Sequence, residues 1–200
     1  MIIGICGFQS SGKDTIADFL IKEYGFKKMS FAGALKDIVS IMFGWPRDKL
    51  EGLTKEDREW REKIDTWWSR KLKNPLLSPR YVLQYFGTDL FRNNWNPDIW
   101  VHIMENKLDE FGSNVVITDC RFQNEIQMIS RLGGKIIQVH RDMPSWFNTY
   151  KSGIDVFEVK NIHCSEIEWI RCYYDYEVEN NGTIEELNKN VANILKLKPN

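Results

Sequence analysis

A glycine-rich run directly after an apolar stretch constrains the fold of this chain more than any other feature. Residues 1–6 have the composition of a short buried strand, and residues 7–13 follow with the pattern Gly-x-x-x-x-Gly-Lys. In this pattern backbone N–H groups surround an anion and the lysine reaches the outer phosphates. Apolar residues at i, i+3, i+4 and i+8 from Ile16 predict a helix next. An anion in the loop would therefore lie at a helix N-terminus, which favours negative charge.

Further short apolar segments alternate with helical patterns along the chain. Such alternation predicts a parallel sheet with helices on both faces. The predicted strands are residues 1–6, 27–31, 115–118, 135–140 and 176–179. A capping box formed by Thr183 and Glu186 predicts the start of the final helix. We therefore predict an α/β fold with a five-stranded parallel sheet flanked by helices.

Composition narrows the class of protein. Two hundred residues without a Gly-, Ser- or Pro-rich linker predict a single domain over residues 1–200. The net charge of −1 argues against a nucleic-acid partner, which would require a strongly basic face. The four cysteines show no Cys-x-x-Cys spacing and fit reduced thiols. Without a membrane-length apolar run or a leader-like start, we expect a cytoplasmic protein with no membrane partner.

Two segments interrupt the alternation of strands and helices. Residues 45–79 are more chain than one crossover helix needs, so we predict an insertion there. Ligands of doubly wound sheets bind at the carboxyl ends of the strands, and this insertion is placed to cover a phosphate acceptor. An i, i+4, i+7, i+8 stripe within it predicts an amphipathic helix, and its members are Trp60, Ile64, Trp67 and Trp68. Residues 142–161 also follow a strand end, and we predict that they act as a lid.

The chain contains the parts that phosphoryl transfer requires, namely a phosphate loop, a carboxylate to hold a metal, and arginines. An apolar strand ends at Asp119 in the form of a Walker-B segment, and Arg121 follows two residues later. In the loop, Asp14 stands where Ser or Thr normally serves magnesium, and Thr15 supplies a hydroxyl one residue later. Arg141 begins the predicted lid and can meet phosphate or stack on a base.

Several of these features also have simpler interpretations. Arg141 can be an ordinary exposed arginine, and the polar run from Gly87 to Trp95 can be a capped loop rather than a nucleotide pocket. Arg80 precedes the helix that leads into this run. We interpret Ser165 as a helix cap and its neighbour His163 as a binding residue rather than a catalytic base.

The motifs together resemble those of the phage and viral deoxynucleoside monophosphate kinases. The order and approximate spacing of the matching motifs agree almost from end to end, except in residues 45–79, where the match is weak. The matching segments are Gly12-Lys13-Asp14-Thr15, Ala17-Asp18-Phe19, Gly87-Thr88-Asp89-Leu90 with Asn93-Asn94 and Trp100, Thr118-Asp119-Cys120-Arg121 with Glu125, Val139-His140-Arg141, and His163-Cys164-Ser165-Glu166. The resemblance implies a P-loop kinase fold, transfer of the ATP γ-phosphate to a deoxynucleoside monophosphate, and a possible homodimer.

On this interpretation ATP and Mg²⁺ are the cofactors, and each candidate residue has a role. The candidate catalytic residues are Lys13, Asp119, Arg121 and Arg141. The candidate ATP-binding residues are Gly7, Ser10, Ser11, Gly12, Lys13, Asp14 and Thr15, and the candidate metal ligands are Asp14, Thr15 and Asp119. The candidate acceptor-binding residues are Arg80, Gln84, Thr88, Asp89, Trp100, Arg121 and His163.

Two alternatives stay open from the sequence. One is a P-loop kinase that acts on another small phosphorylated metabolite. The other is a nucleotide-dependent switch or binding protein that hydrolyses ATP slowly and signals by changing shape. A kinase needs a second anionic site, whereas a switch needs a partner surface. Arg80, Arg121 and Arg141 favour the kinase.

Overall fold

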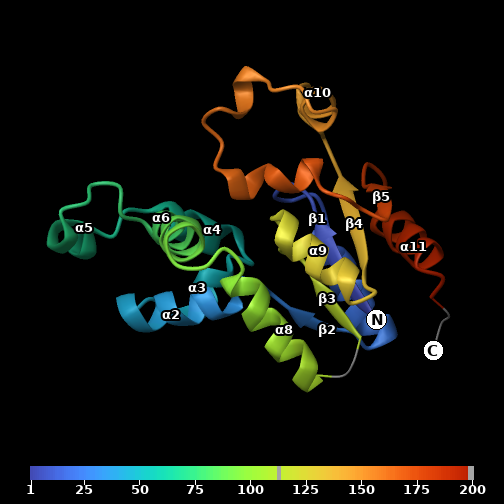
Figure 1. Ribbon diagram of the computed structural model, residues 1–200, viewed down its shortest axis with the longest axis horizontal. Helices are drawn as coiled ribbons and strands as arrows, with labels where there is room; N and C mark the ends of the chain where they lie inside the picture. The colour runs from blue at the N-terminus through green and yellow to red at the C-terminus, as the bar shows by residue number, and fades with distance from the viewer. Residues whose placement is uncertain (112–113, 198–200) are drawn as a thin grey trace. The chain divides into compact units, whose positions relative to one another are not determined.

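Five parallel strands form the central sheet of one of the two compact units in this computed structural model (Figure 1). The sheet unit comprises residues 1–30 and 107–200, and the helical unit comprises residues 31–106. The structure describes residues 1–111 and 114–197, so residues 112–113 and 198–200 of the predicted domain lie outside the described residues. A single domain over residues 1–200 stays a prediction.

The strands lie in the order β2-β3-β1-β4-β5, and every neighbouring pair is parallel. They are β1 (Ile2–Cys6), β2 (Lys27–Met29), β3 (Val115–Ile117), β4 (Lys135–His140) and β5 (Tyr176–Glu179). This confirms the predicted sheet. Because β1 lies between β3 and β4, the loops that follow these three strands meet at one edge, where doubly wound sheets bind their ligands.

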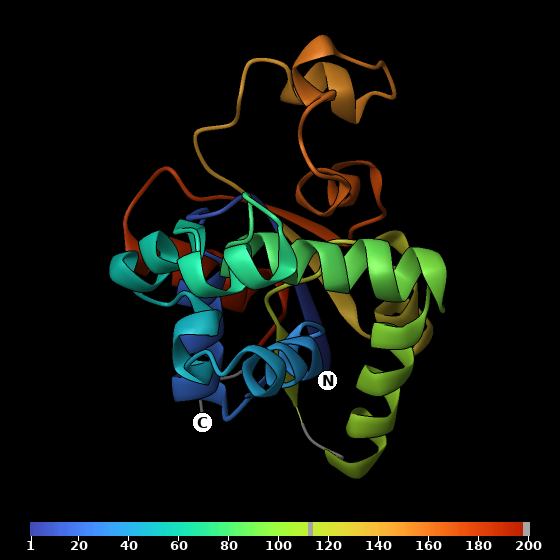
Figure 2. The same cartoon turned by 90° about the vertical axis from the view of Figure 1, so that its left-hand side faces the viewer.

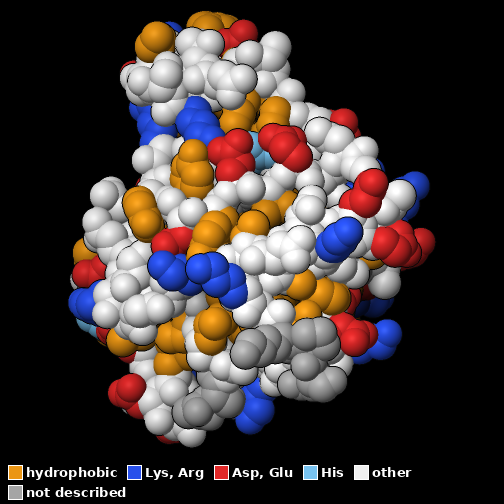
Figure 3. Space-filling model, turned by 90° about the vertical axis from the view of Figure 1, so that its right-hand side faces the viewer, with side chains coloured by type: hydrophobic (Ala, Val, Ile, Leu, Met, Phe, Trp, Pro, Cys, Tyr) orange, Lys and Arg blue, Asp and Glu red, His pale blue; other side chains and the backbone are white. Residues whose placement is uncertain are grey.

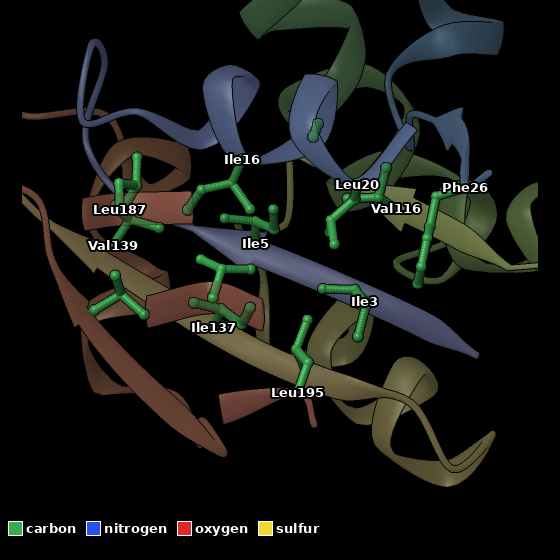
Figure 4. Close-up of a cluster of buried hydrophobic side chains, with 13 residues drawn as sticks. Ile3, Ile5, Ile16, Leu20, Phe26, Val116, Ile137, Val139, Leu187 and Leu195 are labelled. Carbon is green, nitrogen blue, oxygen red and sulfur yellow. The ribbon is translucent and has the colours of Figure 1, made fainter. Parts of the chain in front are cut away.

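Helices cover both faces of this sheet. The helices of the sheet unit are α1 (Lys13–Tyr24), α9 (Gln123–Arg131), α10 (Phe147–Lys151) and α11 (Ile184–Ile194). On one face, Ile3 and Ile5 of β1 pack with apolar side chains of α1 and α11 in a common core (Figure 4). On the other face α9 approaches so closely that a Cβ added to Gly4 would lie 2.6 Å from Ile129 Cδ1. The unbroken apolar sequence of β1 is thus explained by burial on both faces.

The segment between β4 and β5 contains the predicted lid and extends beyond the carboxyl end of β4 (orange in Figure 1). After α10 it forms the 3₁₀ turns η2 (Phe157–Val159), η3 (Cys164–Glu166) and η4 (Glu168–Arg171). Phe8 of the phosphate loop packs edge-on against its aromatic rings, with centroid distances of 6.0 Å to Trp146, 6.0 Å to Phe147 and 5.2 Å to Trp169. Aromatic packing therefore connects the base of this segment to the phosphate loop.

The helical unit has a separate core. Its elements are α2 (Gly33–Phe43), α3 (Arg47–Glu51), α4 (Lys55–Glu62), α5 (Thr66–Leu72), α6 (Pro79–Gln84), the π-helix η1 (Tyr85–Leu90), α7 (Phe91–Asn94) and the start of α8 (Ile99–Phe111) (Figure 2). Val39 and Leu50 are fully buried in this core, and Phe43 stacks on Trp45 at 4.4 Å between ring centroids. Among the described residues of both units, we find no helix with the length and apolar character that crossing a bilayer requires.

The amphipathic helix predicted from the stripe at Trp60, Ile64, Trp67 and Trp68 is wrong. The chain leaves α4 after Glu62 and enters α5 at Thr66. Asp65 causes the break, because its carboxylate caps α5 by accepting the backbone N–H groups of Trp67 and Trp68, both at 3.0 Å. The cap at Asp65 thus starts a new helix where the spacing of apolar residues predicted a continuous one, and Trp67 is 52% exposed as a result.

Candidate active site

The loop between β1 and α1 has the backbone that a phosphate loop needs. Ser10 (φ 63°) and Gly12 (φ 106°) are left-handed. A Cβ added to Gly7 would lie 2.7 Å from the carbonyl oxygen of Val139, so only glycine fits there. Gly12 is the N-cap of α1 and has no side chain with which to cap it. The backbone N–H groups of the first turn can therefore bind an anion.

Ser11 presents a buried hydroxyl inside this loop. The residue is 1% exposed, and among the described residues its Oγ has no hydrogen-bond partner. A buried polar atom left without a partner costs about 1–3 kcal/mol. Ser11 Oγ is therefore a candidate donor to a bound phosphate, and its place among the ATP-binding residues stays a prediction.

Asn180, which sequence reasoning missed, fixes the end of the loop. Its Nδ2 donates a buried hydrogen bond of 2.8 Å to the carbonyl oxygen of Ser11. The same amide comes so near Gly12 that an added Cβ would lie 2.3 Å from Nδ2. Asn180 directly follows β5, and the only sequence signal nearby is the turn at Asn181-Gly182.

Lys13 is held over the loop by a hydrogen bond of 2.6 Å from its Nζ to the carbonyl oxygen of Phe8. Burial and the nearby positive charge of Arg121 together lower the pKa of Lys13 to about 8. Two cations held close together in a partly buried place are electrostatically unfavourable, and an anion between them relieves the repulsion. The pair therefore predisposes the loop to bind phosphate.

Acidic and polar groups hold Arg121 in place. Its Nη1 donates to Glu166 Oε1 at 2.6 Å and to the carbonyl oxygen of Ser165 at 3.3 Å. Burial acts to lower the pKa of Arg121, but Glu166 outweighs it and holds that pKa above its ordinary value. Buried Glu125 accepts the backbone N–H of Arg121 at 2.7 Å and so fixes the turn after β3. Arg121 and Glu166 are 45 residues apart in the sequence, so no local pattern predicts that they pair.

The interpretation of Ser165 as a helix cap is wrong. The cap of η3 is His163, whose Nδ1 accepts the backbone N–H of Ser165 at 3.3 Å. The Ser165 hydroxyl lies 2.8 Å from the same nitrogen. A histidine ring nitrogen can accept hydrogen bonds as a serine oxygen does, and sequence patterns rarely use it as a cap signal. His163 thus lies beside the residues that hold Arg121.

Carboxylate and hydroxyl side chains lie after the ends of β1 and β3. Thr118 Oγ1 donates to Asp14 Oδ1 at 3.3 Å, and Ser30 Oγ donates to Asp119 Oδ2 at 2.6 Å. Burial acts to raise the pKa of Asp14, but the hydrogen bond and charge of Lys28 outweigh it and hold that pKa below its usual value. With half-buried Thr15 on α1, these carboxylate and hydroxyl oxygens are the hard donors that magnesium prefers. The donor set therefore fits Mg²⁺.

Arg141 directly follows β4 and lies beside the phosphate loop. It lines a cavity of about 470 Å³ whose other lining residues are Phe8, Gln9, Ser10, Asp142 and Pro144. Its side chain is 52% exposed, and its Nε is 3.7 Å from Asp142 Oδ2. Exposure leaves the guanidinium able to move within this cavity, next to the loop.

The other candidate acceptor residues belong to the helical unit. Arg80 was predicted to precede a helix, but it lies within α6, because Ser78 caps this helix and Pro79 is its first residue. Its Nε is 3.9 Å from Glu62 Oε1. Gln84 ends α6, and Thr88 and Asp89 lie in η1. Short π-helical segments are rare and frequently occur at functional sites, and the sequence pattern did not distinguish this one from an ordinary helix.

Trp100 has a packing role in the helical unit. It is 3% exposed, and its indole Nε1 donates to the carbonyl oxygen of Gly87 at 2.8 Å. Its ring also meets Phe91 at 5.4 Å between centroids. The indole therefore supports the backbone of η1, while direct contact of Trp100 with an acceptor stays a prediction.

This chain is similar in sequence to deoxynucleotide monophosphate kinases of viruses and phages. A family model described as deoxynucleotide monophosphate kinase matches residues 55–191. A putative deoxynucleotide monophosphate kinase of Acanthamoeba polyphaga mimivirus is 33% identical over 198 residues, which cover 93% of this chain and 91% of that protein. The deoxynucleoside-5'-monophosphate kinase of Escherichia phage T5 is 26% identical over 251 residues, covering 100% of this chain and 98% of that protein.

Among solved structures, dephospho-CoA kinase from Campylobacter jejuni aligns with a TM-score of 0.48 and 16% identity, over 98% of this chain and 95% of that one. Shikimate kinase from Aquifex aeolicus aligns with a TM-score of 0.45 and 16% identity, over 98% of this chain and 96% of that one. At these values the likeness supports no conclusion about the reaction.

Proposed function

This chain belongs to the deoxynucleotide monophosphate kinase family, and we propose that it transfers the γ-phosphate of ATP to a deoxynucleoside monophosphate to give the diphosphate. The observation that carries the proposal is the pair of Lys13 and Arg121: Lys13 Nζ is held at the phosphate loop 2.6 Å from the carbonyl oxygen of Phe8, and Glu166 Oε1 holds the Arg121 guanidinium at 2.6 Å. Phosphoryl transfer depends mainly on positioning and on neutralising charge, and this pair serves both needs.

On the donor side, Lys13 and the backbone N–H groups of the loop bind the β- and γ-phosphates. Ser11 Oγ, which is buried without a hydrogen-bond partner among the described residues, adds a donor. Ser10 and Gly12 contribute the left-handed backbone that turns the N–H groups inward. Arg141 neutralises charge from the side of the loop where the cavity lies.

On the acceptor side, Arg121 binds the phosphate of the monophosphate. Its guanidinium already donates through Nη1 to one carboxylate oxygen of Glu166, and a phosphate can accept two parallel N–H bonds from a guanidinium and carries more charge. Within the sheet unit, His163 is the other proposed contact to this substrate. Contacts from the helical unit, through Arg80, Gln84, Thr88 and Asp89, stay predictions of the sequence. No covalent intermediate on the protein is needed.

Asp14, Thr15 and Asp119 are the proposed holders of Mg²⁺, whose charge would offset that of the phosphates when it is bound. Ser30 orients Asp119 through its hydrogen bond, and Thr118 does the same for Asp14. A homodimer, which the resemblance implies, is part of the proposal, and sedimentation analysis of the purified protein would test it.

The direct test is a panel of deoxy and ribo monophosphates assayed with ATP and Mg²⁺ for formation of both ADP and the nucleoside diphosphate. We expect equal amounts of the two products with at least one deoxynucleotide. ADP formed at the same rate without any acceptor would indicate a slow ATPase that acts as a switch. Activity confined to a non-nucleotide phosphate would contradict the proposed acceptor.

A further inference from the structure

A buried histidine faces two carboxylates at the carboxyl ends of β4 and β5. In the parallel register His140 lies opposite Glu179, and Gln138 lies opposite Glu177. His140 Nδ1 is 3.3 Å from Glu177 Oε1 and 3.5 Å from Glu179 Oε1. The histidine side chain is 3% exposed, whereas both carboxylates reach the surface. Figure 3 shows acidic side chains on both sides of a recessed histidine.

Hydrogen bonding on the far side of the ring determines which nitrogen faces the carboxylates. Gln138 is fully buried, and its Nε2 donates to the carbonyl oxygen of Trp169 at 3.1 Å. Because that carbonyl can only accept, the amide oxygen of Gln138 must face His140 Nε2, 3.4 Å away. His140 Nε2 therefore carries the hydrogen in the neutral ring. The lone pair of Nδ1 then points at two negatively charged oxygens.

Each carboxylate is also held by its second oxygen. Lys151 donates to Glu177 Oε2 at 2.6 Å, and Asn181 Nδ2 donates to Glu179 Oε2 at 3.2 Å. The Oε1 atoms of both residues remain directed toward His140. Polar partners that orient the ligands in this way are characteristic of built metal sites in proteins.

We propose that His140, Glu177 and Glu179 form a binding site for one divalent transition-metal ion such as Zn²⁺. Two ligand atoms each about 2.1 Å from a tetrahedral zinc ion lie about 3.4 Å apart, which matches both nitrogen–oxygen distances. The three ligand atoms all lie within 4.8 Å of one another. A cation would satisfy the Nδ1 lone pair and both carboxylates, whereas one proton on Nδ1 can point at only one of them.

The site differs in chemistry and place from the proposed magnesium site. Magnesium prefers oxygen ligands, whereas an imidazole nitrogen with two carboxylates suits zinc and its neighbours in the first transition row. None of the three residues takes part in the proposed binding of ATP or the acceptor. The ion would join the end of β4 to the end of β5 and, through Lys151 on α10, to the base of the predicted lid. Its role would therefore be structural.

The test uses the full chain after treatment with a chelator, followed by calorimetric titration with Zn²⁺ in the presence of excess Mg²⁺. We expect one bound ion and a higher Tm, because a ligand that binds only the folded state stabilises it. Glu179→Gln should weaken Zn²⁺ binding at least about tenfold and abolish the rise in Tm. Glu185→Gln, an exposed glutamate on α11, is the matched control and should bind Zn²⁺ as the unchanged protein does.

Cobalt supplies an independent measurement, because its absorption spectrum reports the ligand atoms. We expect d–d bands without a thiolate charge-transfer band, and loss of these bands in His140→Gln and in Glu179→Gln. Thiolate absorption would assign the ion to a cysteine such as the exposed Cys164 and would overturn the proposal. Equal zinc affinity of Glu179→Gln and Glu185→Gln, or no binding at micromolar zinc, would overturn it as well.

Discussion

The candidate site residues of the sheet unit and those of the helical unit are held in place by different kinds of structure. In the sheet unit, the candidate site is made largely of backbone and of side chains set at strand ends, and glycine positions such as Gly7 and Gly12 tolerate no side chain. In the helical unit, the candidate residues lie on α6 and η1 above an aromatic core around Phe43 and Trp45. The difference teaches that the backbone shape of the phosphate loop depends on its own glycines, whereas the candidate residues of the helical unit depend on how a separate core is packed.

The largest effect is expected from removing the loop cation. Lys13→Ala should lower turnover by about 10²–10³-fold, because the charge of Lys13 acts most strongly on the transition state. The protein should stay folded, because burial and the charge of Arg121 make the charged Lys13 side chain unfavourable in the folded state, as its lowered pKa indicates. Activity assays with thermal melts would check both expectations, with the exposed Lys189→Ala as control. Near-normal kinase activity with an unchanged melt would remove this loop as the donor site.

A cavity made in the helical core should lower the stability of the protein without lowering its affinity for ATP. Leu50 is fully buried there, so Leu50→Ala should lower the free energy of unfolding by about 2–5 kcal/mol. Binding of a non-hydrolysable ATP analogue should change less than about twofold, since Leu50 belongs to the core of the helical unit and the phosphate loop belongs to the sheet unit. Denaturation followed by tryptophan fluorescence, beside calorimetry of the analogue, measures both quantities. Leu53→Ala, at a position 65% exposed, is the control.

If Leu50→Ala lowers the affinity for the ATP analogue as well as the free energy of unfolding, the phosphate loop depends on the packing of the helical core. The helical core would then contribute to the donor site as well.

Arg121 tests the assignment of the acceptor within the sheet unit. Arg121→Ala should lower kcat/KM for the monophosphate by about 10–100-fold, the usual worth of a charged hydrogen bond. Arg121→Lys should recover only part of this loss, because an ammonium cannot reproduce the planar fork of a guanidinium. Paired titrations with an ATP analogue and a monophosphate would locate the effect. Weaker binding of the analogue alone would assign Arg121 to the donor side.

The smallest effect concerns pH. The charged form of Lys13 is required, and its pKa of about 8 means that this charge is lost as the pH rises through that value. We expect kcat/KM for ATP, which reports the free enzyme, to decline a few-fold above about pH 8. In Arg121→Ala the decline should move to higher pH, since the Arg121 charge no longer depresses the pKa of Lys13. Identical pH profiles for the two proteins would show that the cations do not interact.

Sequence reasoning succeeded where structure is determined over short distances. The strand, the loop and the helix from Ile2 to Tyr24 follow from an apolar run, a glycine pattern and a helical period, each within a few residues. The parallel sheet followed from repetition of such units. These elements were predictable because their causes are local.

The rest of the site depends on contacts between distant residues. Glu166 and Asn180 reach Arg121 and Ser11 across 45 and 169 residues, and neither belongs to a local pattern that announces a partner. In the helical unit, one capping residue, Asp65, was enough to divide a helix that the apolar period predicted as continuous. The π-helical geometry at Thr88 is likewise set by tertiary packing rather than by intrinsic propensity.

The hydrogen bond from Asn180 to Ser11 has a consequence for the order in which the protein is made. A ribosome adds residues at about 5–20 per second, so Ser11 and Asn180, 169 residues apart, are separated by about 8–34 seconds during synthesis. Throughout that interval the phosphate loop exists without the amide that supports its final turn. The phosphate loop is thus among the first parts of the chain to be made, and its supporting hydrogen bond can form only after β5 and Asn180 have been added.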